Sequence, residues 1–133
     1  MSATLALTDQ HKSTVRSAAY GAVSLISAAS DKPHKAAIAG SLALTSATGH
    51  IGHVLNAKSK DIHLSGKTVA DLADQVLPAL TAAATLLDQQ SPTEADNFRT
   101  TVLVALEAAA TASRPSPVVT DMTRKVTAAL HTA

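Results

Sequence analysis

The fold is decided by one stretch, residues 33–56, which read PHKAAIAGSLALTSATGHIGHVLN. Its main apolar stripe recurs every three or four positions, as on one face of a helix, and consists of Leu44, Ala47, Ile51 and Leu55. Ile38 and Leu42 lie on another side of the same predicted helix. Because a helix that is apolar on more than one side is usually central, we expect residues 33–56 to form one helix at the centre of the fold.

The same stretch is rich in small residues. Three glycines each cost a helix about 1 kcal/mol relative to alanine, and another helix crossing at short range would explain them: Gly40, Gly49 and Gly52. A small-residue strip also runs along one side, made of Ala36, Gly40, Ala43 and Ala47. Such a strip can receive a neighbouring helix inside the monomer, which we favour, or form the close contact of a homodimer.

Two helices flank this stretch directly. The first is predicted over residues 9–29, capped by Thr8 and ended by the segment before Pro33. The next begins near Thr68, after the connection 57–67, and contains Pro78. Proline lacks the N–H that a helix interior needs, so we expect a kink there or a break into two helices.

Two further helices complete the chain. Ser91-Pro92-Thr93-Glu94 opens the fourth, with serine as the cap, proline at the first helical position and Glu94 reaching back to the cap amide. The last begins at Ser116-Pro117. We expect its apolar face to be Val118, Met122, Val126 and Ala129.

The composition agrees with this pattern. Alanine fills 28 of the 133 positions, while the chain holds one Phe, one Tyr, no Trp and no Cys. Small side chains and high helix propensity favour helices packed closely together. We therefore predict an all-α fold, a single compact bundle of five helices, or six if Pro78 divides the third. Residues 1–133 form one domain in this prediction, with residues 1–7 a loose N-terminal segment.

The charge balance excludes some partner classes. The net charge is +1, which predicts no general attraction to nucleic acid or to a membrane surface. The longest apolar stretch, residues 36–57, carries too many polar side chains for a membrane span. The absence of cysteine fits a cytoplasmic protein. The composition resembles that of small Ala/Thr/Asp-rich proteins from bacteria with high-GC genomes.

The halves of the chain differ in charge. Residues 1–67 carry seven Lys and Arg against three Asp, whereas residues 68–133 carry four against seven Asp and Glu. The two halves can face one another within a single fold, or two chains can pair head to tail.

The histidines offer one candidate site. His50 and His53 are three residues apart, so they lie on adjacent turns of one helical face and could share a metal ion. His63 and Asp61 in the following connection could complete a zinc or iron site. The metalloprotease and di-iron motifs are both missing here. The alternative is that the two helical histidines are simply polar members of a helix edge.

Enzymatic motifs find little support. Ser65-Gly66-Lys67-Thr68 resembles the end of a phosphate-binding loop, but Asp61 stands where the motif requires glycine. The chain also lacks a Gly-x-Ser-x-Gly elbow. We therefore predict a non-enzymatic structural or protein-interaction module, with self or another protein as partner and no cofactor. The alternatives are the metal-binding bundle and a bundle that holds a small apolar ligand between its helices.

Overall fold

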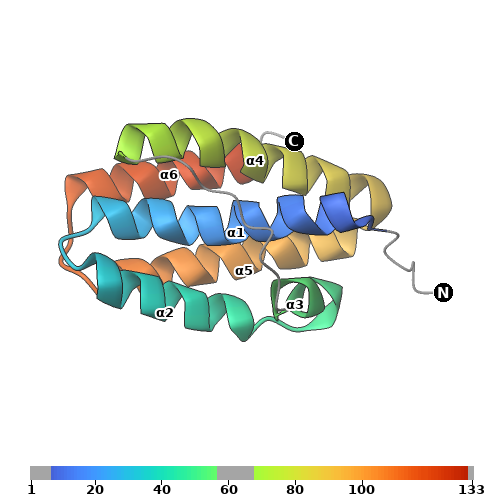
Figure 1. Cartoon of the computed structure of the whole chain (residues 1–133), viewed down its shortest axis with the longest axis horizontal. Helices are drawn as coiled ribbons and strands as arrows, with labels where there is room; N and C mark the ends of the chain where they lie inside the picture. Colours follow the sequence, from blue (N-terminus) through green and yellow to red (C-terminus); the bar gives the residue numbers. More distant parts are fainter. Residues whose placement is uncertain (1–6, 57–67, 132–133) are drawn as a thin grey trace.

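The computed structural model describes residues 7–56 and 68–131, which contain helices and no strand. These helices pack into one bundle (Figure 1). Their bounds are α1 Asp9–Ala29, α2 Pro33–Thr45, α3 Gly49–Asn56, α4 Val69–Gln90, α5 Pro92–Thr111 and α6 Pro117–His131. The predicted all-α bundle is confirmed, and its sixth helix arises from residues 33–56 rather than from a division at Pro78.

The central helix of the bundle is α1. It runs between α4 and α6 on one side and α2 and α5 on the other (Figure 1), and it contacts all five other helices. Six of its residues have no exposed surface: Val15, Ala18, Ala19, Ala22, Leu25 and Ile26. Three of the six are alanines, whose small side chains let neighbouring helices approach closely. The expectation that residues 33–56 form the central helix is therefore wrong.

The start of α1 agrees with the sequence. The Thr8 hydroxyl oxygen accepts a hydrogen bond from the His11 amide at 3.1 Å, and His11 Nδ1 accepts from the Thr8 amide at 3.4 Å. Together they satisfy two amides that the first helical turn leaves without partners. Leu7, just before this cap, is half-buried and packs against the core.

Residues 33–56 form two helices instead of one. The break falls between Thr45 and Gly49, where Gly49 adopts φ +73°, the left-handed region that glycine enters without strain. Two side chains of α5 hold this turn. Glu94 Oε1 accepts a hydrogen bond from the Ile51 amide at 3.2 Å, and Asn97 Nδ2 donates to the Thr48 carbonyl oxygen at 3.0 Å.

The other end of α3 is held by α1. The Tyr20 hydroxyl donates to the Leu55 carbonyl oxygen at 2.9 Å, and the buried Arg16 donates through a guanidinium nitrogen to the Val54 carbonyl oxygen at 3.3 Å. A positively charged guanidinium at the C-terminus of a helix and a negatively charged carboxylate at its N-terminus both interact favourably with the helix dipole. Side chains of two neighbouring helices thus stabilise an eight-residue helix that would be marginal alone.

Pro78 lies within a continuous helix. α4 runs unbroken from Val69 to Gln90, so the alternative of two separate helices is wrong. It begins at the predicted position, where the Thr68 hydroxyl oxygen caps the helix by accepting from the Asp71 amide at 3.1 Å. Near Pro78, the Thr81 hydroxyl donates to the Ala129 carbonyl oxygen of α6 at 2.8 Å, which ties the two helices together.

The last helix matches its predicted apolar face at three of four positions, since Val126 is buried and Met122 and Ala129 pack against the core. The exception is at its start. Val118 is about half exposed, whereas its neighbour Val119 is buried, as are Val126 and Leu130. Arg99 of α5 fastens the end of this helix by donating to the Leu130 carbonyl oxygen at 2.9 Å. Its guanidinium also pairs with Asp88 of α4 at 2.6 Å. The hydrogen bond and charge of Asp88 raise the pKa of Arg99 above its ordinary value.

Within the described residues, none of the helices combines the length and the apolar character that crossing a bilayer would demand.

Candidate interaction surface

The helix α2 has one face turned into the bundle, which we call the inner face. Its buried members are Ala36, Gly40 and Leu44. A Cβ added at Gly40 would lie 2.7 Å from Val23 Cγ1 and 3.3 Å from the Ala105 carbonyl oxygen. The backbone of α2 therefore approaches α1 and α5 so closely that any larger residue at position 40 would force Val23 to shift. This part of the predicted small-residue strip packs inside the monomer, as favoured from the sequence.

The other two glycines have different causes. Gly49 supplies the positive φ of the turn before α3. A Cβ at Gly52 would overlap the carbonyl group of Ala47, which belongs to the chain just before that turn. The expectation that a crossing helix explains all three glycines is correct for Gly40 and wrong for Gly49 and Gly52.

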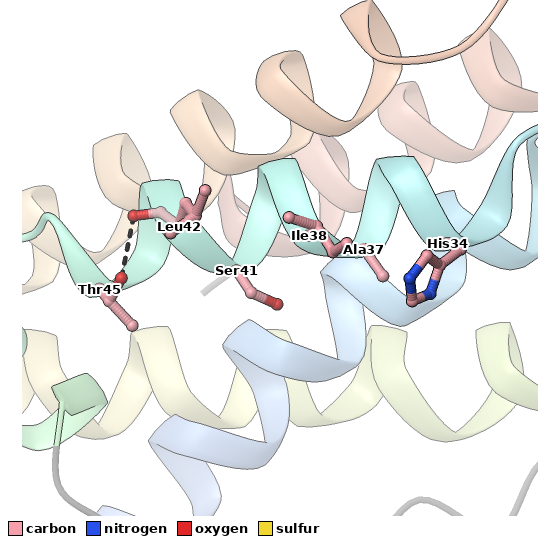
Figure 2. Close-up of a pocket in the computed structure, with 6 residues that line it drawn as sticks. All are labelled: His34, Ala37, Ile38, Ser41, Leu42 and Thr45. Atoms are coloured by element: carbon pink, nitrogen blue, oxygen red, sulfur yellow. Dashed lines mark hydrogen bonds between the residues drawn. The ribbon is translucent and has the colours of Figure 1, made fainter.

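The opposite side of α2, which we call the outer face, is exposed. Ile38 and Leu42 are 50% and 63% exposed there, one helical turn apart. They flank an open groove of about 370 Å³. Figure 2 shows the side chains of this face projecting from successive turns of one helix, and they are His34, Ala37, Ile38, Ser41, Leu42 and Thr45.

The outer face carries no formal carboxylate, ammonium or guanidinium group, since its six residues are aliphatic, hydroxyl-bearing or imidazole side chains. The hydroxyl at its far end is used locally: Thr45 Oγ1 donates to the Leu42 carbonyl oxygen at 3.0 Å (Figure 2). Ser46 Oγ donates to the same oxygen at 2.9 Å. Both bonds add to the backbone bond that the Ser46 amide donates to the same oxygen at 3.1 Å. They turn these hydroxyls back onto their own helix and leave the face chiefly apolar.

Local sequence explains where α2 begins and ends. Pro33 occupies its first turn, where a missing N–H costs nothing, and the inner-face alanines favour the helix. At the other end, the hydroxyls of Thr45 and Ser46 bond back to the Leu42 carbonyl oxygen beside the Ser46 amide, and the helix ends there.

The predicted metal ligands are placed only in part. His50 and His53 lie on α3 with exposed side chains, while His63 and Asp61 fall outside the described residues. Among the residues that the structure does describe, there is no group of three or more potential ligands. The zinc or iron site therefore remains a prediction.

Sequence reasoning missed the outer face because it took Ile38 and Leu42 as signs of a central helix. The sequence did contain a signal for this face. Ile38 and Leu42 lie on the opposite side of the helix from the small residues Ala36 and Gly40, and residues 36–48 contain no Asp, Glu, Lys or Arg. A helix that packs through its small side would leave these larger side chains outside.

Comparison with known proteins identifies no relative of this chain. No protein-family model matches the chain, and neither a curated protein nor a solved structure matches it.

Proposed function

We propose that this protein is a non-enzymatic protein-interaction module that binds its partner through the outer face of α2. The observation that carries the proposal is the contrast within one helix: Leu44 is fully buried, whereas Leu42, two residues earlier, is 63% exposed. Single exposed aliphatic residues are common on protein surfaces. Here two of them lie one turn apart beside a groove on an uncharged face.

Burial of this face would release free energy. Apolar surface removed from water contributes roughly 25 cal/mol per Å². Ile38 and Leu42 offer large apolar side chains to a partner, because each is at least half exposed. A partner helix laid along α2 would cover both at once, which is a common mode of recognition by helical proteins.

The shape of the groove favours a macromolecule over a small ligand. Sites for small molecules generally enclose about 70–90% of the ligand surface. This groove lies along the outside of one helix and is open to solvent. It is suited to receive side chains from another protein surface.

The test is site-specific photo-cross-linking in cells that produce the protein. A photoactivatable residue at position 38 samples the outer face, and one at position 104 samples an equally exposed site on α5, where Val104 is 52% exposed. We expect covalent protein adducts from position 38 in excess of those from position 104. Equal yields at both positions, or no adduct at position 38, would contradict the proposal.

A further inference from the structure

We draw no further inference here: the strongest candidate, the apolar groove between α5 and α6 that Leu106 and Val119 line, carries nothing because nothing in the structure shows what covers it.

Discussion

Glu94 Oε1 lies 3.2 Å from the Ile51 amide nitrogen and accepts its hydrogen bond, although 43 residues separate the two in the chain. Glu94 was expected to close a capping box with Ser91 in its own helix. The Ser91 hydroxyl does accept from the Glu94 amide, at 3.4 Å, but the Glu94 carboxylate accepts from the Ile51 amide at the start of α3 and from Asn97 Nδ2 at 3.5 Å. This contact helps to explain why residues 33–56 turn at Thr48 and Gly49 instead of continuing as one helix.

Glu94→Ala should loosen α3. Loss of a side chain that caps a helix costs about 1 kcal/mol, and here the free energy of unfolding should fall by that amount. Exchange of the Ile51 amide with solvent deuterium should accelerate more than exchange in the centre of α1. Glu107→Ala, an exposed carboxylate on the same helix, is the control. An unchanged Ile51 exchange rate would show that the carboxylate does not hold the turn.

Leu42 and Leu44 form a matched pair for the two faces of α2. Leu44→Ala removes a fully buried side chain and should lower the free energy of unfolding by about 2–5 kcal/mol, as should Ile51→Ala. Leu42→Ala should change it by less than about 0.5 kcal/mol when measured at high dilution. Chemical denaturation provides the comparison. Similar losses at residues 42 and 44 would mean that α2 does not have one buried and one exposed side.

Gly40→Ala should destabilise the protein, although alanine is the better helix former by about 1 kcal/mol. The new methyl group would lie 2.7 Å from Val23 Cγ1, and valine has little rotamer freedom with which to move away. We expect a net loss of about 1 kcal/mol, since overpacking a core costs roughly 1–3 kcal/mol. Introducing Val23→Ala makes room, so the loss caused by Gly40→Ala should shrink in that background. Strictly additive losses in this double-mutant cycle would disprove the close approach of α1 and α2.

Ionisation of Tyr20 should make the free energy of unfolding depend on pH in the alkaline range. Burial raises the pKa of its hydroxyl above 10.0, because the charged phenolate is poorly solvated there. Because the pKa is higher in the folded state than in the unfolded chain, the protein is more stable when the Tyr20 hydroxyl is neutral than when it is ionised. This contribution is complete below the ordinary pKa and is lost as pH rises through the folded pKa.

The titration of Tyr20 can be followed directly, since it is the only tyrosine in the chain. Ultraviolet absorbance should place its midpoint above 10.0 in the folded protein and near the ordinary value in denaturant. Tyr20→Phe should show a smaller loss of stability than wild type over the same alkaline range. A folded midpoint at or below 10.0 would contradict the burial of this hydroxyl against Leu55.

The histidine hypothesis has an equally direct test. A non-enzymatic interaction module predicts well under one equivalent of transition metal in protein purified without chelator, measured by elemental analysis. One equivalent of zinc or iron that disappears in the His50→Ala/His53→Ala variant, but not in His34→Ala, would favour the metal-binding alternative. His34 lies on a different helix and is a matched exposed imidazole.

The features that could be predicted from sequence depend on neighbouring residues. Thr8 caps α1 through His11, three positions away, and the predicted helix 9–29 matches the observed bounds. The buried residues of α4 and α5 also recur every three or four positions on one side of each helix, as Leu72, Val76, Leu80, Ala83 and Leu87 do in α4 and Phe98, Val102, Ala105 and Ala109 do in α5. In these elements, local hydrogen bonds and helical periodicity indicate the same structure.

The features that were mispredicted depend on contacts between distant segments. The turn before α3 is held by Glu94 and Asn97, more than 40 residues later in the chain. The exposure of Ile38 and Leu42 follows from Gly40 packing against Val23 and Ala105, which turns their side of α2 outward. Apolar periodicity identifies the sides of a helix that can be buried, but neighbours elsewhere in the fold decide which side is covered.

Photo-cross-linking at position 38 tests most directly whether the outer face of α2 is a binding surface. The account predicts that a photoactivatable residue at position 38 gives covalent protein adducts in excess of those from position 104, which is equally exposed on α5. Adding Leu42→Gln should reduce the yield from position 38 and leave the yield from position 104 unchanged. Equal yields from the two positions, or a yield from position 38 that Leu42→Gln does not change, would contradict it.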